Sequence, residues 1–211
     1  MDFDRARREL VDRLIERGRI DRPATERAMR AVRRHEFVPS KRREAAYRDR
    51  PLPIGEGQTI SAPHMVAMMT DLLAPDADDR ILEIGTGCGY HAAVTSEVID
   101  PGTVYSVEVE PELARAARDR LDRLGYDVRV RVGDGFAGWP DHAPYDGAYL
   151  TCAPQSIPDV IVEQVRPGGR IVAPVGRGRQ RLVRLTRRAD GGVDRETHGA
   201  VRFVPMRAPE D

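Results

Sequence analysis

The sequence predicts a doubly wound α/β fold, in which a mostly parallel sheet ends in an antiparallel hairpin and a helical cap precedes it. From residue 80 onward, short apolar runs alternate with amphipathic helical patterns, as parallel strands joined by crossover helices do. After residue 176 two strand patterns flank the turn at 189–192, which predicts a hairpin. The 211 residues suit one domain. We expect a cap and loop at 1–62, an α/β core at 63–176 and the hairpin at 177–211.

The composition favours a soluble protein without a nucleic-acid or membrane partner. The 34 basic and 34 acidic residues balance to a net charge of +0, so no field of one sign would draw the chain to a polyanion. No apolar signal region or membrane-spanning stretch is visible. Two cysteines without Cys-x-x-Cys spacing indicate neither a disulfide framework nor a zinc site. We therefore expect no metal and a cytoplasmic location.

The first 40 residues form the predicted helical cap. Apolar residues recur on one face between Arg5 and Arg17, and Gly18 ends that helix. A second helix begins near Pro23, a residue suited to a first turn. Acidic residues interleave with the basic ones here, so we interpret the charges as a solvated face.

A loop rich in proline and glycine follows. Pro51 and Pro53 require an extended or turned backbone, and two glycines nearby predict a flexible approach to the next helix. That helix starts at Pro63 and runs through Leu72. From spacing alone, Ser61 is interpreted as its N-cap, and the histidine that follows Pro63 as a residue packed on the core.

The core is organised around a glycine-rich turn. The run Ile81–Ile84 predicts a buried strand, and Tyr90–Ile99 a helix; Gly-x-Gly-x-Gly lies between them. Glycines let the backbone approach a ligand where a Cβ would collide, and the helix N-terminus attracts polar or negative atoms. Tyr90 stands where the dinucleotide-binding fingerprint needs its third glycine. Together with Glu83, the turn resembles motif I of S-adenosylmethionine-dependent methyltransferases. The resemblance implies that the glycines admit the amino-acid end of the cofactor and that the acid helps to organise its ammonium group.

The next two strands supply further candidate contacts. Thr103–Val109 predicts a strand with Glu108 near its carboxyl end, about twenty residues past the turn, where an acid binds ribose hydroxyls. The alternative is a surface carboxylate. A helix from Pro111 to Leu124 leads to a strand at 127–132, and then Gly133, Asp134 and Gly135 could meet an adenine amino group. The alternative there is an ordinary turn.

The remaining elements complete the sheet. We expect a strand at Tyr145–Thr151 whose end lies over the ligand, a helix at Ile157–Val165 and a strand at Arg170–Val175. Two hairpin strands follow, at Gln180–Arg187 and Val193–Val204. Strand–helix alternation that ends in a hairpin is typical of the Rossmann-like methyltransferase sheet and not of a full dinucleotide-binding fold.

Taken together, blocks spread over most of the chain resemble the protein-L-isoaspartate O-methyltransferase family. The most specific is Gly-Gln-Thr-Ile-Ser-x-Pro, from Gly57 to Pro63; it overrides the interpretation of Ser61 and His64 as structural residues. Cys88 stands where the family usually has serine, and a thiol is a poorer hydrogen-bond partner than a hydroxyl. The matching blocks are Phe37–Pro39, Ala46–Pro63, Leu82–Tyr90, Gly133–Pro140, Ala143–Asp146 and Val201–Pro205.

The resemblance implies methyl transfer from S-adenosylmethionine to the free α-carboxylate of L-isoaspartyl residues in damaged proteins and peptides. The ester then cyclises to a succinimide, which returns part of the chain to aspartate. Ser61 would orient the acceptor carboxylate, and Ile54 and Gln58 would join it in binding substrate. The implied cofactor-binding residues are Thr59, Ile60, His64, Glu83, Gly85, Thr86, Gly87, Cys88, Gly89, Glu108, Val109, Gly133, Asp134, Gly135 and Thr151.

This chemistry needs few catalytic groups. A carboxylate with a pKa of about 4 is already ionised at neutral pH, so no general base is required. Three alternatives remain from the sequence: a relative that esterifies a normal aspartate of a dedicated peptide partner, a cofactor-binding module without catalysis, and an NAD-dependent reductase, which Tyr90 and the hairpin disfavour. We expect a monomer.

Overall fold

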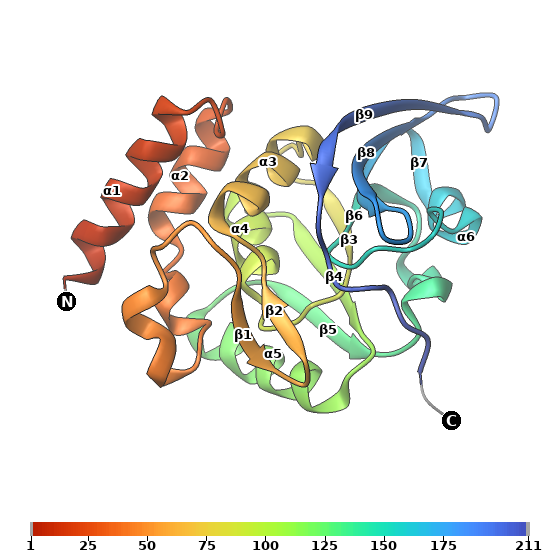
Figure 1. Cartoon of the computed structure of the whole chain (residues 1–211). Coiled ribbons are helices and arrows are strands. Elements are labelled where there is room, and N and C mark those ends of the chain that lie inside the picture. The colour runs from red at the N-terminus through yellow and green to blue at the C-terminus, as the bar shows by residue number, and fades with distance from the viewer. Residues whose placement is uncertain (1, 210–211) are drawn as a thin grey trace.

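A seven-stranded sheet forms the centre of the molecule (Figure 1). The computed structural model describes residues 2–209. The strand order is β5-β4-β3-β6-β7-β8-β9; the first five of these strands are parallel, and β8 and β9 are antiparallel. The predicted fold class is confirmed. The strands are β3 (Arg80–Ile84), β4 (Thr103–Glu108), β5 (Val128–Val132), β6 (Tyr145–Leu150), β7 (Val165–Val175), β8 (Gln180–Arg187) and β9 (Val193–Val201).

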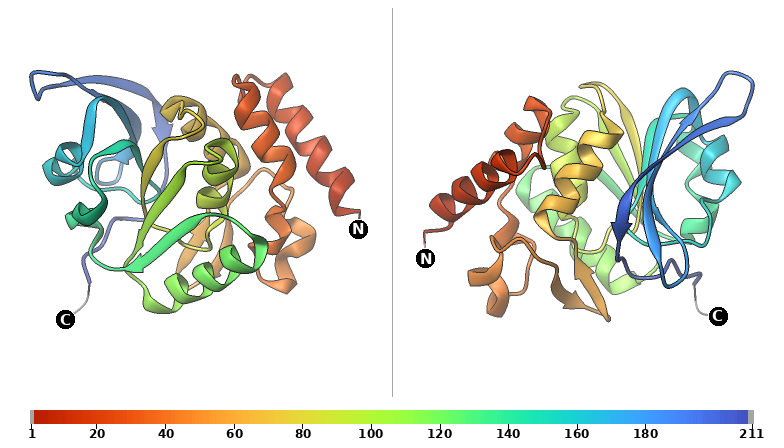
Figure 2. Two further views of the ribbon diagram at one scale, coloured as in Figure 1. Left: turned by 180° about the vertical axis from the view of Figure 1, so that it is seen from behind. Right: turned by 45° about the horizontal axis from the view of Figure 1, so that its top comes forward.

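Helices cover both faces of this sheet (Figure 2). One core cluster joins α3, α4, α5 and the cap to one face, and a second joins α6 to the other. Successive strand residues point to opposite faces, so Ile81 belongs to the first cluster and Leu82 to the second. The helices are α1 (Phe3–Glu16), α2 (Pro23–Ala31), α3 (Pro63–Leu73), α4 (Tyr90–Val98), α5 (Pro111–Leu124) and α6 (Asp159–Glu163).

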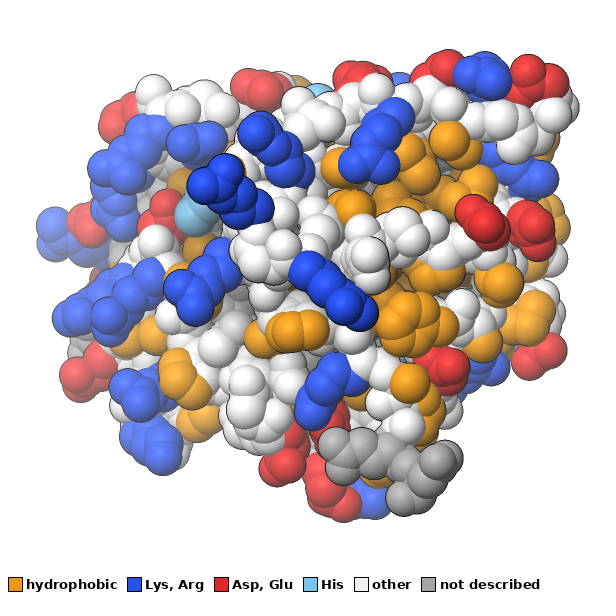
Figure 3. Space-filling view, turned by 45° about the vertical axis from the view of Figure 1, so that its right-hand side comes forward, with side chains coloured by type: hydrophobic (Ala, Val, Ile, Leu, Met, Phe, Trp, Pro, Cys, Tyr) orange, Lys and Arg blue, Asp and Glu red, His pale blue; other side chains and the backbone are white. Residues whose placement is uncertain are grey.

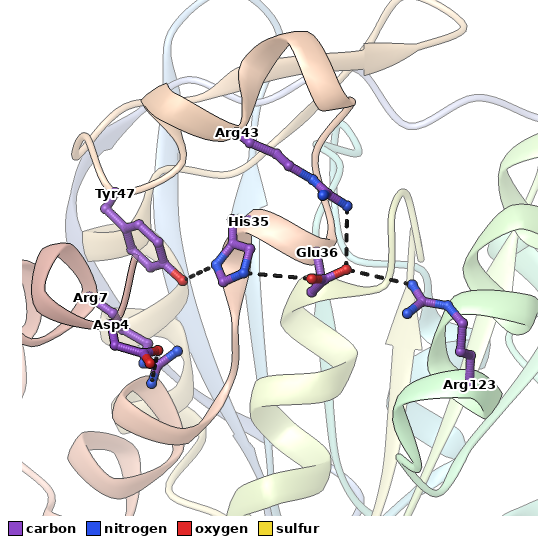
Figure 4. A network of polar contacts seen from close by, with 7 residues as sticks. All are labelled: Asp4, Arg7, His35, Glu36, Arg43, Tyr47 and Arg123. Carbon is purple, nitrogen blue, oxygen red and sulfur yellow. Dashed lines mark hydrogen bonds and ion pairs between the residues drawn. The ribbon is translucent and has the colours of Figure 1, made fainter. Parts of the chain in front are cut away.

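Polar contacts, some buried and some exposed, hold the N-terminal cap together and join it to the helices that cover the sheet. Nδ1 of His35 lies 2.7 Å from the Tyr47 hydroxyl, and the Glu36 carboxylate lies 3.4 Å from Arg43 and 3.8 Å from Arg123 of α5 (Figure 4). Arg34 is fully buried, donates to the carbonyl of Ala46 at 2.8 Å and lies over the ring of Tyr90 at the start of α4. The cap thereby holds the segment that leads to the glycine turn.

Three details differ from the sequence prediction. The glycine-rich approach is an ordered hairpin of β1 (Leu52–Gly55) and β2 (Gln58–Ile60), because Glu56 (φ 48°) and Gly57 (φ 67°) form a left-handed turn that matches strand twist. The helix α6 has only five residues, since β7 begins at Val165 through an irregular register with β6. The strand β9 ends at Val201.

No helix within 2–209 is long and apolar enough to cross a membrane.

The interpretation of Ser61 as a helix cap is wrong. Ala62 occupies the N-cap of α3, and no side chain at that position makes a capping bond. Instead, the Asp49 carboxylate accepts from the backbone N–H of His64 at 2.9 Å. A residue distant in sequence therefore satisfies the helix terminus, which leaves the Ser61 hydroxyl free of that structural task.

Candidate active site

Three glycines at the tip of β3 bring the backbone to the edge of a cavity. Gly85, Gly87 and Gly89 have φ values of 96°, 54° and 86°, which side chains rarely adopt. A Cβ on Gly85 would collide with the Thr151 hydroxyl, which itself donates to the Gly85 carbonyl at 2.5 Å. A Cβ on Gly89 would meet Leu121 at 3.0 Å. The turn therefore needs glycine for both conformation and space.

Two adjoining hollows and a groove surround this turn. The first hollow, here the sheet-tip cavity, holds about 560 Å³ of space including its open mouth. The second, the glycine-loop cavity, lies between the turn and the end of β2. The outer groove, about 1520 Å³ including its open mouth, runs between the start of α3 and the segment Ala200–Pro205. Thr59 and Thr151 line all three spaces, and Ser61 lines both the glycine-loop cavity and the outer groove.

Glu108 lies where the sequence predicts it. It lines the sheet-tip cavity at the carboxyl end of β4 and is 5% exposed. Its Oε2 accepts from the N–H of Gly87 at 2.7 Å and its Oε1 from the N–H of Glu110 at 3.1 Å. Each carboxylate oxygen has a second lone pair, so the group can still accept hydrogen bonds from a ligand while it holds the glycine turn.

Glu83 lies behind the turn and not on a cavity wall. It is fully buried; Oε1 accepts from the Tyr149 hydroxyl at 2.9 Å and Oε2 from the Ser106 hydroxyl. Burial raises the pKa of Glu83 to about 8, because the charged form loses its hydration. The Ser106 hydroxyl lies 2.5 Å from that of Thr86 in the turn. Glu83 therefore supports the turn through Ser106 rather than facing a ligand, contrary to its expected contact with an ammonium group.

His64 belongs to the outer groove rather than to either cavity. Its Nδ1 lies 2.8 Å from Oδ1 of Asp49, the same oxygen that caps α3. Both side chains remain partly exposed, at 32% and 26%. His64 thus lines neither cavity, and its expected contact with the cofactor stays a prediction.

Most other predicted residues line the two cavities, and a few do not. Gly133 lies beside the sheet-tip cavity, in a separate hollow that Val109 also lines. The Asp134 carboxylate accepts from the Phe136 N–H at 2.9 Å, the ordinary turn role given as its alternative. Ile54 covers the turn, because a Cβ on Gly87 would meet its side chain at 3.4 Å. The predicted residues that do line a cavity are Gln58, Thr59, Ile60, Ser61, Gly85, Thr86, Gly87, Cys88, Glu108, Val109, Gly135 and Thr151.

Two groups of lining residues escaped the sequence argument. Val66, Tyr90 and His91 line the glycine-loop cavity, and Val204–Arg207 lines the sheet-tip cavity. The resemblance to the family included the Val201–Pro205 block, but its sequence pattern did not indicate that this segment lies beside the glycine turn. The isolated bridge between Ala153 and Pro205 brings it there.

The surroundings of Cys88 determine the reactivity of its thiol. Cys88 is buried on the wall of the glycine-loop cavity, and burial raises its thiol pKa, which keeps it protonated and a poor nucleophile. Within residues 2–209, no cluster of three or more His, Cys, Asp or Glu side chains is placed to hold a metal ion.

The chain is similar to known proteins over nearly all of its length. Residues 5–211 match the family model described as protein-L-isoaspartate(D-aspartate) O-methyltransferase. Protein-L-isoaspartate O-methyltransferase 2 of Archaeoglobus fulgidus is 50% identical over 98% of this chain and 95% of the relative. The protein-L-isoaspartate O-methyltransferase of Methanopyrus kandleri is 50% identical over 97% and 92%.

Solved structures agree on the fold. A structure described as protein-L-isoaspartate O-methyltransferase superposes with a TM-score of 0.86 at 29% identity; it covers 94% of this chain, which spans 65% of that longer chain. A Plasmodium falciparum structure described as a putative member, in complex with S-adenosyl-L-homocysteine, gives a TM-score of 0.83 at 21% identity over 95% and 98%.

Proposed function

The chain belongs to the protein-L-isoaspartate(D-aspartate) O-methyltransferase family, and we propose that it methylates the free α-carboxylate of L-isoaspartyl residues with Ser61 as the group that orients the acceptor. The methyl donor is S-adenosylmethionine. The observation that carries the role of Ser61 is its position: it is the serine shared by the glycine-loop cavity and the outer groove. A group at that junction can touch a substrate in the groove and face a donor in the cavity.

The residues present suit the cofactor. Glycines at 85 and 87 leave room that a Cβ would fill, and Glu108 offers ribose hydroxyls two carboxylate oxygens at the carboxyl end of β4. Gly135 lines the part of the sheet-tip cavity that we assign to the adenine. It packs so closely on Ile84 that a Cβ would lie 2.5 Å from that side chain, so this position needs glycine. The first turn of α4 offers free N–H groups to a carboxylate. When bound, S-adenosylmethionine supplies a methyl group carried on a positively charged sulfur.

The chain's own residues then have a limited task. The acceptor carboxylate is ionised at neutral pH, so no side chain needs to remove a proton. The Ser61 hydroxyl donates a hydrogen bond to one carboxylate oxygen and thereby directs the other towards the methyl group. Ile60 and Val66 line the same cavity with apolar surface, which excludes water between the opposite charges. Positioning of this kind is worth about 7 kcal/mol or more in favourable intramolecular cases.

The outer groove is the proposed peptide site. Its walls include apolar residues of both segments, such as Met65 and Phe203, and the cation Arg202. Figure 3 shows basic side chains spread over the left and centre of one face of the molecule, although the whole chain has a net charge of +0. Such a surface favours approach of an anionic isoaspartyl segment. Gln58 and Ile54, the other two proposed substrate contacts, lie on the hairpin that covers the glycine turn and not on the wall of this groove.

The role of Ser61 is tested by Ser61→Ala with paired isoaspartyl and aspartyl peptides. We expect methyl transfer to the isoaspartyl peptide to fall about tenfold to a hundredfold, because a hydrogen bond to a charged group is worth about 1.5–3 kcal/mol. Affinity for S-adenosylhomocysteine should stay unchanged. Ser61→Thr, which retains a hydroxyl, should keep more activity. An unchanged rate for Ser61→Ala would contradict this role of Ser61. Equal rates of the wild-type protein on both peptides would contradict the proposed specificity for isoaspartyl residues.

Three further features of this proposal concern the whole chain. We infer that the cap, core and hairpin act as one methyltransferase unit, because a single buried cluster runs from Leu10 through Leu182. We infer a monomer, in which one chain supplies every proposed site residue. Free Cys88 and Cys152 suit a reducing cytoplasm.

A further inference from the structure

A histidine of the glycine-loop cavity has one ring nitrogen without a partner. His91 lies in the first turn of α4 and is 6% exposed. Its ring lines the cavity together with Gly85 and Gly87. Among the described residues, its Nδ1 is buried and has no hydrogen-bond partner. A buried polar atom left in this way costs free energy unless a ligand or a water satisfies it.

The neighbours of His91 decide which ring nitrogen carries the proton. Nε2 lies 3.3 Å from the hydroxyl oxygen of Thr70, and that hydroxyl gives its own hydrogen to the carbonyl of Val66 at 2.9 Å. The Thr70 oxygen must therefore accept from Nε2–H. In the neutral ring Nδ1 is then a bare lone pair, an acceptor only.

The ring is held in this orientation and in this charge state. The ring of Tyr149 packs against it with centroids 4.2 Å apart, so rotation of the imidazole is restricted. Burial lowers the pKa of His91 to about 3, because the imidazolium would lose its hydration. The titratable groups packed nearby are the Tyr149 phenol, whose pKa is raised well above its usual value, and Glu83, which is bonded to that phenol. Neither group favours the charged imidazolium at neutral pH.

A neutral acceptor in this cavity suits a positively charged donor. Glu83, the acid expected to meet such a group, already accepts from two hydroxyls and is fully buried. We propose that Nδ1 of His91 accepts a hydrogen bond from the α-ammonium group of the cofactor's amino-acid end. This assignment depends on the proposed function, since it concerns the same cofactor. His91 thus replaces Glu83 as the residue of this chain that recognises the ammonium group.

The proposal is tested by comparing S-adenosylhomocysteine with its analogue in which hydrogen replaces the α-amino group. Calorimetric titration of the wild-type protein should show about a tenfold preference for the amine, as expected for a charge-assisted hydrogen bond. His91→Leu should reduce that preference to about twofold or less. His91→Gln, which offers a carbonyl acceptor, should restore part of it. His142→Leu, which alters a histidine packed on Tyr105 outside the cavities, should leave it unchanged.

A spectroscopic readout separates recognition from a structural role. In protein with ¹⁵N-labelled histidine, the Nδ1 resonance of His91 should move upfield on addition of S-adenosylhomocysteine and stay in place with the deaminated analogue. Equal shifts with both ligands, or a preference for the amine that survives in His91→Leu, would overturn the assignment while leaving the proposed function intact. Failure of the wild-type protein to bind S-adenosylhomocysteine at all would overturn both.

Discussion

The two walls of the proposed active site are built in different ways. The inner wall consists of the tips of β3, β4 and β6. Behind it, Glu83 is fully buried and bonded to the equally buried Ser106 and Tyr149. The outer wall consists of the β1–β2 hairpin and the segment Val201–Arg207, most of which is partly or fully exposed. The inner wall faces a cofactor that never varies. The outer wall is the side proposed to bind protein segments, which differ from one substrate to the next.

The outer wall is fastened at a few points only. The Gln180 side chain accepts from the Phe203 N–H at 2.6 Å and donates to its carbonyl at 3.0 Å. Ala153 exchanges backbone bonds with Val204 at 2.8 Å and Met206 at 2.9 Å. The difference between the walls indicates that cofactor geometry is set before binding, whereas the substrate side keeps exposed backbone that can adapt.

The largest expected effect comes from breaking the inner wall at Gly85. Gly85→Ala would place a Cβ against the Thr151 hydroxyl and would strain a φ of 96°. We expect methyl transfer to fall about a hundredfold or more, because displacements of about 1 Å near the reacting atoms can cost that much. S-adenosylhomocysteine affinity, measured by calorimetry, should fall as well.

The matched control for this change is Gly178→Ala. Gly178 also has a positive φ, 72°, but nothing lies within 4 Å of the added Cβ. It should show the conformational cost of about 1–2 kcal/mol in stability without loss of affinity. Equal losses of affinity in both variants would show that strain, and not the collision with Thr151, explains the effect.

A smaller effect, on stability, is expected from the charge state of Glu83 behind the inner wall. Its pKa is about 8 in the folded protein against 4.5 for an ordinary glutamate. The folded state therefore binds more protons than the unfolded state between these values, and stability falls as the pH rises through that window, by up to about 1.4 kcal/mol for each unit of pKa separation. Glu83→Gln should remove this fall, as urea unfolding across the window would measure.

Comparing the wild-type protein with Glu83→Gln separates the effect of Glu83 on stability from the effects of other buried groups. His91, with its pKa lowered to about 3, makes stability rise with pH up to about the ordinary histidine value, but it does so equally in both proteins. A constant difference in unfolding free energy between wild type and Glu83→Gln across the window would show that Glu83 is ionised throughout.

The smallest effect is expected at the outer wall. Asp49→Ala removes the cap of α3 and frees the His64 ring beside the groove. We expect a loss of about 1 kcal/mol in stability, as for other helix caps. We also expect a severalfold rise in KM for an isoaspartyl peptide, with unchanged affinity for S-adenosylhomocysteine.

A carboxylate that bonds the backbone just before another helix supplies the control. Asp71 accepts from the N–H of Asp21 at 2.6 Å and of Arg22 at 3.4 Å, at the start of α2 and outside the three spaces. Asp71→Ala should show a similar loss of stability with an unchanged KM. A rise in KM for both variants would mean that general loosening, not the outer wall, is being measured.

Much of the fold was predictable because its signals are local. The apolar run at 81–84, the alternation of strands and helices and the terminal hairpin are all patterns of a few residues, and each is present in the structure. The shortened α6 and the early start of β7 were not predictable, because pairing with β6 decides where that strand begins.

The sequence by itself determined the order of strands and helices along the chain, the glycine turn and the family, since backbone conformation and motif spacing are encoded in neighbouring residues. Only the tertiary structure decided which side chains face the cavities. It buried Glu83 against Tyr149, gave the α3 cap to Asp49, and left Nδ1 of His91 without a partner. These outcomes depend on hydrogen bonds and burial between segments far apart in the chain, which no local pattern records.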